Sequence, residues 1–274
     1  MSLADLLNSR FAGVDGAADN EEPAVPALAR VLGRRTHRRY TDKPLPPMLI
    51  DQLIRAALSA SSKSDFQQAS VLKLQDPAKR AAIGAEFPAM PWIGAAPVFL
   101  VFLADPRRLE CIGEMRGHRQ PNRDLEAFLN ASVDAALAMQ TFILTAEAMG
   151  LGCCPISVIR NKLPLVAGLL KLPDGVYPVA GLCVGWPADE GHVSMRLPLS
   201  VTVHTDSYDT STLEPGVDAY DRARHERHAI TQQRNPGKFG EAPFYGWSED
   251  KARQAAEPEG AAFAEHIRRS WFRF

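Results

Sequence analysis

The stretch RDLEAFLNASVDAALAMQTFILTAEAMGLG, residues 123–152, decides the fold. Its apolar residues recur at helical spacing along the whole stretch, which predicts one helix about 40 Å long. A helix that is apolar on nearly all sides lies in the centre of a core or at a subunit interface. Gly150 and Gly152 mark its expected end. The polar residues inside it argue against a membrane span, and they are Asn130, Asp134, Gln140 and Glu147.

The segments on both sides predict an α+β protein. Helices are expected at residues 27–33, 46–60, 76–87, 161–175 and through most of 217–274. Strands are expected at 69–76, 97–105, 176–189 and 199–208, with a short extended piece at 153–160 and polar loops at 33–47 and 106–122. The predicted apolar face of the helix at 46–60 is Leu49, Leu53, Ile54, Ala57 and Leu58. Because helices and strands mix without a regular βαβ alternation, we expect a sheet sandwiched by helices.

Composition excludes several classes of protein. The chain has 274 residues, of which 46% are hydrophobic, and this is enough to bury a sizeable core. Lys and Arg number 31 against 32 Asp and Glu, whereas a nucleic-acid binder usually has a basic domain or stripe. The N-terminus has no basic start followed by an apolar stretch, and no long uncharged apolar segment follows, so we expect a cytoplasmic protein without membrane contact. The four cysteines lack metal-ligand spacing and predict reduced, partly buried thiols.

A local basic cluster stands out against this balance. Residues 33–40 read GRRTHRRY, with four arginines and a histidine around one threonine. The cluster could bind a nucleic acid or a membrane, form a solvated loop, or hold one small anion. Because the charge is confined to a few residues of a nearly neutral chain, we favour a small anionic partner.

Further polar positions lie just outside apolar elements, at Ser61, Ser62 and Ser64 and at Arg196. Arginine forks and hydroxyls at such junctions suit a phosphate monoester, which takes charge-assisted and bidentate hydrogen bonds. Motifs for a catalytic nucleophile or a dinucleotide fingerprint are missing, and no metal site is predicted. His225 and His228 have helical spacing but no third ligand, so we interpret them as part of a solvated face. Asp134 is interpreted as a paired interior carboxylate rather than a general base.

Taken in order, three segments resemble the nitroreductase superfamily, and most closely its branch of major oxygen-insensitive nitroreductases and NADPH–flavin oxidoreductases. The first is RRTHRRYTDKPLPPMLIDQLIRAALSASSKSDFQQASVLKL, residues 34–74. The second is AEAMGLGCCPISVIRN, residues 146–161. The third joins YPVAGLCVGWPAD at 177–189 to RLPLSVTVHTDSY at 196–208. The resemblance covers roughly residues 28–210, and several motifs in register make it more specific than any one of them.

The resemblance implies a sandwich of helices around a central, mostly antiparallel sheet, in an intertwined homodimer with FMN at the subunit interface. Residues 1–26 would be an N-terminal extension, 27–210 the FMN-binding core, and 211–274 a helical C-terminal extension wrapping the partner subunit. The implied activity is that of a flavoprotein oxidoreductase. NADPH or NADH would reduce FMN, which would then reduce a nitroaromatic, quinone or flavin acceptor by a ping-pong mechanism. The chemistry would belong to the flavin, with no essential catalytic side chain.

The resemblance also implies roles for single residues. Arg34 and Thr36 would hold the FMN phosphate with Arg196 as a second cation, and Arg35 belongs to the same cofactor-binding loop. Arg38 would approach the pyrimidine edge of the flavin, where positive charge stabilises the reduced, anionic form. The serines of the turn would line the phosphate, the ribityl chain and the ring edge. The implied cofactor-binding set is Arg34, Arg35, Thr36, Arg38, Ser61, Ser62, Ser64, Pro155, Ile156, Ser157, Val158 and Arg196, with Gln67 nearby.

The chain departs from the branch at several of these positions. Ser157 and Val158 stand where close relatives have two glycines, and Ser194 stands where they have a lysine. Pro155 replaces a tyrosine, Met90 or a neighbour replaces a glutamine that faces the flavin, and the basic residues left for an NADPH 2′-phosphate are Arg234 and Lys238. These changes motivate an alternative, an FMN-binding protein of the same fold that has lost turnover and serves in sensing or storage. A basic interaction module built on the arginine cluster is a third hypothesis.

Overall fold

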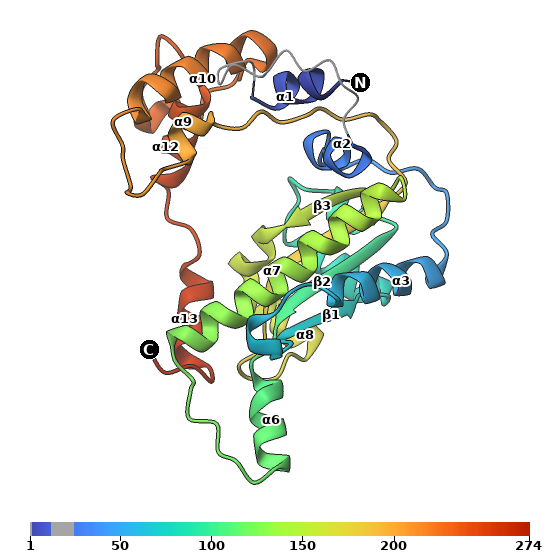
Figure 1. The fold of residues 1–274 in the computed structure, drawn as a ribbon. Coiled ribbons are helices and arrows are strands. Elements are labelled where there is room, and N and C mark those ends of the chain that lie inside the picture. Colours follow the sequence, from blue (N-terminus) through green and yellow to red (C-terminus); the bar gives the residue numbers. More distant parts are fainter. Residues whose placement is uncertain (1, 12–24) are drawn as a thin grey trace. The chain divides into compact units, whose positions relative to one another are not determined.

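The computed structural model describes residues 2–11 and 25–274. The chain divides into two compact units, and each is described here by itself (Figure 1). The sheet unit contains residues 35–191 and 259–274. The helical unit contains residues 1–34 and 192–258, of which residues 1 and 12–24 lie outside the described part. The predicted N-terminal extension therefore lies within the helical unit, and half of it falls outside the described residues.

A four-stranded antiparallel sheet forms the centre of the sheet unit. Its strands are β1 Ala69–Lys73, β2 Val98–Ala104, β3 Gly152–Ile156 and β4 Tyr177–Gly185. They lie in the order β1-β2-β4-β3, and each neighbouring pair is antiparallel. β1 and β3 therefore form the two edges. This confirms the predicted α+β class with an antiparallel sheet.

Helices cover both faces of this sheet. α3, Pro47–Leu58, and α7, Leu125–Ala148, pack on the face that carries Leu100 and Phe102 of β2 (Figure 1). The opposite face packs against three shorter helices, α4 Pro77–Ala85, α5 Trp92–Ala95 and α8 Leu163–Leu170. The other elements of the unit are η1 Lys63–Asp65, α6 Arg107–Met115, η2 Ser157–Lys162 and α13 Ala261–Arg269. The sandwich expected from the sequence is present.

The long helix α7 has one side in the core and one side exposed. Its inner side buries Asp134, Ala138 and Phe142. By length and composition alone it is the one helix in the described part of the chain that could cross a membrane, with 33% of its most apolar window buried. The exposed apolar residues follow each other at intervals of four, and they are Leu125, Leu129, Val133 and Leu137. This stripe runs along one side of the helix, next to the packed side.

The carboxylate of Asp134 fixes the turn between α3 and β1. Asp134 is 2% exposed, and its two oxygens accept the backbone N–H groups of Lys63 at 2.9 Å and Gln68 at 3.0 Å. Both donors belong to the serine-rich turn, residues 59–68, which enters β1 at Ala69. The prediction that Asp134 is a paired interior carboxylate is confirmed.

In its described part, the helical unit contains helices and no named strand. They are α1 Leu3–Phe11, α2 Pro26–Leu32, α9 Leu199–Thr202, α10 Leu213–His228, α11 Pro236–Phe239 and α12 Trp247–Ala255. The buried Asp221 of α10 accepts the backbone N–H of Ser248 at 3.0 Å in the first turn of α12. A Cβ added to Gly246 would lie 2.5 Å from an Asp221 oxygen, so this close approach requires glycine. The mostly helical C-terminal region was predicted.

Three expectations were wrong. Residues 106–122 were expected to be a polar loop but contain α6, which is exposed on most sides and therefore has little apolar periodicity. Residues 199–208 alternate like a strand but form the short α9 followed by coil. Alternation of apolar and polar residues shows only that a segment could pair as a strand. Residues 199–208 have no strand neighbour in the described part of the chain. On α3, Ile50 is buried and Leu58 is 51% exposed, because the buried face is turned relative to the predicted one.

The four cysteines, all in the described part of the chain, are thiols and are not joined by disulfides. Cys153, Cys154 and Cys183 are buried, whereas Cys111 on α6 is exposed. Cys154 faces Cys183 across the antiparallel pair β3–β4. Burial raises the pKa of the Cys183 thiol well above its usual value, with a further contribution from neighbouring Cys154.

Replacing Asp134 tests how the turn is held. Asp134→Ala removes the acceptor for two buried N–H donors, so we expect a loss of about 3 kcal/mol in the free energy of unfolding. Urea denaturation followed by circular dichroism measures it. Glu126→Ala, an exposed acid on the same helix, is the control and should change stability by no more than about 0.5 kcal/mol. Equal stability of the two variants would contradict this role for Asp134.

Candidate functional site

The basic cluster runs beside the edge strand β3. Thr36 forms a parallel bridge with Cys153, and the His37 N–H donates to the Cys153 carbonyl at 3.1 Å. Four residues further on, Tyr40 bridges Pro187 in antiparallel fashion. The predicted loop is therefore fixed by backbone pairing at both ends, which places its side chains along one edge of the sheet.

Two glycines make this close approach possible. A Cβ on Gly152 would lie 2.7 Å from the Cβ of His37, and one on Gly185 would lie 2.6 Å from the Tyr40 ring. Any larger residue at either position must move the chain, because real Cβ contacts are longer than this. Gly152, which the sequence marked as the expected end of the long helix, therefore also makes room for the basic cluster.

Arg35 and Arg39 of the basic cluster donate hydrogen bonds to the turn after β4. Arg35 Nη1 donates to the Glu190 carbonyl at 2.9 Å, and Arg39 Nε donates to the Asp189 carboxylate at 2.7 Å. The hydrogen bond from Arg39 holds the pKa of Asp189 below its usual value. In this structure Arg35, part of the implied cofactor set, uses its guanidinium on protein backbone.

Arg38 lies over an aromatic ring. Its Cζ is 5.5 Å from the centroid of the Trp92 ring, a cation–π arrangement that limits the guanidinium's freedom. The Trp92 Nε1–H is buried and has no hydrogen-bond partner among residues 2–11 and 25–274. A buried donor without an acceptor is rare in folded proteins, and its place beside a fixed cation is typical of a ligand site.

Pro155 to Val158 continue β3 into η2 on the same edge. Pro155 and Ser157 are exposed, Ile156 is buried, and Val158 is half-buried. The Val158 side chain packs against the core cluster that also includes Met90. The bulk that Val158 adds relative to a glycine is therefore taken up largely by the core.

The serine-rich turn borders a cavity of about 680 Å³. Ser61 and Ser62 line it, and Ser62 Oγ accepts the Gln67 N–H at 3.3 Å. Ser64 does not line it but has a left-handed backbone, with φ of 50°. Asp65 and Gln67 also have positive φ, at 57° and 53°. Such strain in non-glycine residues gathers at functional sites. Polar residues of the cavity wall missed by sequence reasoning are Asp65, Ser70, Arg108 and Asp134.

Within one chain, the serine-rich turn and the basic cluster lie at opposite edges of the sheet. The serine-rich turn leads into β1, whereas the basic cluster and Pro155 to Val158 lie at β3, the opposite edge. Ile156 pairs with Gly181, and the same row continues through Val101 to Leu72 of β1. Three strand spacings across this row amount to about 14 Å. A single phosphate group cannot contact both edges of one sheet.

Arg34 and Arg196 belong to the helical unit. A buried arginine of α1, Arg10, connects their segments. It donates to the Arg34 carbonyl at 2.7 Å and to the Ser194 carbonyl at 2.6 Å, and its own carbonyl accepts the Arg196 N–H at 2.8 Å. Sequence reasoning missed Arg10, because a lone arginine in a short helix carries no pattern that separates it from a solvated one.

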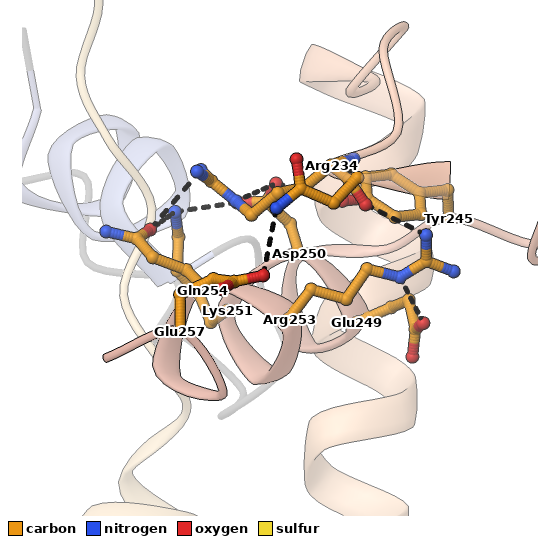
Figure 2. A network of polar contacts seen from close by, with 9 residues as sticks. Arg234, Tyr245, Glu249, Asp250, Lys251, Arg253, Gln254 and Glu257 are labelled. Atoms are coloured by element: carbon orange, nitrogen blue, oxygen red, sulfur yellow. Dashed lines mark hydrogen bonds and ion pairs between the residues drawn. The ribbon is translucent and has the colours of Figure 1, made fainter. Parts of the chain in front are cut away.

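The two residues considered for an NADPH 2′-phosphate are paired with acids. Lys238 Nζ contacts both oxygens of Glu257 at 3.1 Å. Arg234 Nε lies 3.5 Å from the Asp250 carboxylate and also approaches Gln254 (Figure 2). The hydrogen bond from Lys238 lowers the pKa of Glu257. Both cations therefore have structural roles within the helical unit.

Comparison with known proteins agrees with this arrangement. The sequence model of the Nitroreductase family matches residues 31–186, and that of the Nitroreductase family C-terminal domain matches residues 194–274. The chain belongs to the nitroreductase family. The family predicted from the sequence motifs is thus confirmed, and the matches leave α1 outside both ranges.

Relatives within the nitroreductase family cover most of the chain. "FMN reductase [NAD(P)H]" of Bacillus subtilis is 36% identical over 204 residues, which is 73% of this chain and 81% of that protein. "Oxygen-insensitive NADPH nitroreductase" of Salmonella typhimurium is 36% identical over 188 residues, covering 67% and 75%. The structure of the hypothetical oxidoreductase YcnD from Bacillus subtilis aligns with a TM-score of 0.82 at 30% identity, covering 91% of this chain and 99% of that one.

Gly152→Ala tests the close approach at β3. The added Cβ must displace His37, so we expect the variant to lose about 1–3 kcal/mol of unfolding free energy. Gly168→Ala on α8 is the matched control, since nothing lies within 4 Å of its added Cβ. That control should be neutral or slightly stabilising because alanine favours a helix. A Gly152→Ala protein as stable as the control would show that the basic cluster does not depend on this contact.

Proposed function

We propose that this chain is an NAD(P)H-dependent FMN oxidoreductase of the nitroreductase and flavin-reductase type. The observation that carries the proposal is Arg38, a cation that lies over the Trp92 ring within the basic cluster beside edge strand β3. The family match and the names of the relatives, FMN reductase and NADPH nitroreductase, support the same activity. The flavoprotein with NADP(H) or NAD(H) as donor that the sequence predicted is therefore our conclusion.

The residues present fit FMN, which combines a phosphate monoester with a flat, polar ring. In this proposal Arg34, Thr36 and Arg196 hold the phosphate, and Arg35 secures the loop. Arg34 precedes Thr36 by two residues, so their Cα atoms lie within about 7 Å of each other. The unpaired Nε1–H of Trp92 offers a further donor beside Arg38. Ser61, Ser62 and Ser64 supply hydroxyls, and Pro155, Ile156, Ser157 and Val158 pass along the ring.

Bound FMN would take a hydride from NADPH or NADH and give it to a nitroaromatic, quinone or flavin acceptor. The protein's part is to bind, orient and supply charge. Arg38, oriented by Trp92, would supply a positive charge to the bound ring, and such preorganised charge would favour its reduction. We assign no side chain as general acid or base.

The separation of the two edges supports a homodimer with shared sites. If Thr36 and a serine of the turn are both to contact the phosphate group of one FMN, they come from different copies of the chain, because one copy holds them at opposite edges of its sheet. Two-fold symmetry then gives two equal sites at the interface. The exposed apolar stripe of α7 offers the contact surface, since its residues Leu125 to Leu137 would otherwise face water. Wrapping of the partner by residues 211–274 and a cytoplasmic location complete the proposal.

The packing of Val158 favours turnover over the alternative of a binding protein that has lost it. Its side chain contacts the core, as does that of Met90, so neither substitution by itself fills the exposed end of β3. Small acceptors that lie flat against the ring would keep access there.

The visible spectrum of the purified protein, before and after anaerobic NADPH, tests the activity. We expect the bands of oxidised flavin, release of FMN on denaturation, and bleaching by the nucleotide. Arg38→Ala should weaken FMN binding about tenfold and make the flavin potential more negative, because the reduced form loses a cation. Arg39→Ala, which loses a mostly exposed ion pair with Asp189, is the matched control and should change neither.

Two outcomes contradict the proposal in different ways. A protein that binds FMN but is not bleached by NADPH or NADH would be a binding protein. A colourless protein that takes up no added FMN would not be a flavoprotein at all.

Mixing two variants that are impaired at opposite edges of the sheet tests the shared sites. Arg38→Ala damages the β3 edge, and Ser61→Glu places a negative charge on the exposed serine at the β1 edge. In a mixed dimer one site carries both changes and the other carries none. When the subunits are dissociated and recombined in equal amounts, half of the dimers are mixed and one of their two sites is intact. We therefore expect the mixture to exceed both variants and to gain about one quarter of the wild-type activity through these intact sites. Each variant mixed with itself is the control, and no recovery in the mixture would mean that each chain builds its own site.

A further inference from the structure

Helix α1, Leu3–Phe11, lies outside both family matches, which begin at residue 31 and residue 194. It nevertheless contains Arg10, an arginine that is only 6% exposed. Burying a guanidinium is costly unless its donors are used, so such a residue indicates a specific task.

The donors of Arg10 connect two distant segments of the chain. Nε and Nη2 donate to the Leu32 carbonyl at 3.0 and 2.7 Å, and Nη2 also donates to the Arg34 carbonyl at 2.7 Å. Nη1 donates to the Ser194 carbonyl at 2.6 Å. The backbone of Arg10 adds a bond, since its carbonyl accepts the Arg196 N–H at 2.8 Å. One planar side chain thus sets the distance between the backbones that carry Arg34 and Arg196.

Helix α1 is itself held in place on two sides within the helical unit. Leu6 is buried, and its Cδ2 lies 3.7 Å from the point where Gly33 would carry a Cβ. On the other side the Asn8 carbonyl accepts a hydrogen bond from Arg227 of α10 at 2.8 Å. Arg10 is therefore carried by an anchored element.

These hydrogen bonds also bring two positively charged side chains, Arg10 and Arg196, close together. Arg196 Nη1 also donates to the Ser194 carbonyl, at 3.1 Å, so the Arg10 and Arg196 guanidiniums share one acceptor. Two cations at one carbonyl repel each other, and a dianion bound beside them relieves that repulsion. A buried arginine from outside both matched family ranges therefore brings a second cation to the Ser194 carbonyl.

We propose that Arg10 is a positioning residue of the FMN phosphate site, which sets the spacing of Arg34 and Arg196 before the cofactor binds. This inference rests on the proposed function. Because the fork of Arg10 bridges carbonyls of both segments, the two phosphate-binding cations are preorganised and need not be brought together during binding. Helix α1 is then part of the cofactor site.

Comparing FMN with riboflavin isolates this role, since riboflavin has the same ring without the phosphate. We expect Arg10→Ala to raise the FMN dissociation constant about tenfold and to leave that of riboflavin unchanged. Fluorescence titration of the deflavinated full-length protein with each flavin measures both constants. Arg10→Lys keeps the charge but cannot bridge the carbonyls, so we expect it to lose most of the same preference for FMN.

Arg253→Ala is the matched control. Arg253 is a buried arginine of the same unit, 4% exposed, and it donates to the Arg234 carbonyl at 3.0 Å and to Glu249 (Figure 2). Its loss should lower stability to a similar extent, yet the ratio of riboflavin to FMN dissociation constants should stay that of the wild type. Circular dichroism verifies that the variants are folded. If Arg10→Ala does not fold, Arg10→Lys takes its place in the flavin titrations.

The outcomes separate the inference from the proposed function. If Arg10→Ala weakens both flavins equally, or neither, or if Arg10→Lys keeps the full preference for FMN, Arg10 does not position the phosphate site. If the wild-type protein itself binds no flavin, the proposed function fails first, irrespective of Arg10.

Discussion

The buried carboxylate of Asp134 is the constraint on which the site side of the sheet unit depends. It sits in the middle of the long helix α7 and accepts two backbone N–H groups of the serine-rich turn, so the turn cannot move independently of the helix. The turn in turn sets where β1 begins. Because the other side of α7 exposes its apolar stripe, the helix that would contact a second copy is also the helix that positions the serines. In the proposed dimer, association and cofactor binding would therefore be linked through one helix.

Most of the fold was predictable because its elements carry strong local periodicity. Clear apolar patterns predicted a helix at 123–152 and strands around 97–105 and 176–189. These elements are present as α7, β2 and β4. The errors fall where periodicity and environment disagree. Helix α6 is nearly all exposed and has no apolar face to detect, while residues 199–208 alternate but meet no neighbouring strand. Pairing is a property of the partner, which a local pattern does not contain.

The candidate site divides along the same line. The segments that carry the proposed cofactor residues were recognisable because several motifs occur in order. In the structure the basic cluster runs beside a strand of the core, β3. The relation between these segments was not readable, since it requires the strand order that puts β1 and β3 at opposite edges. Arg10 and Trp92 were also missed. Each acts through long-range contacts, Arg10 with Leu32, Arg34 and Ser194, and Trp92 with Arg38. A single residue without a recurring spacing gives no signal of such contacts.

The burial of three of the four cysteines matters for the redox chemistry proposed for this protein. Reduced flavins and the acceptors they serve can pass electrons to oxygen, and the peroxide that results attacks thiolates that solvent can reach. Cys153, Cys154 and Cys183 are shut inside the sheet, and the raised pKa of Cys183 keeps that sulfur protonated at neutral pH. Oxidative ageing of the protein would therefore begin at Cys111, on the surface of α6, and leave the sheet intact.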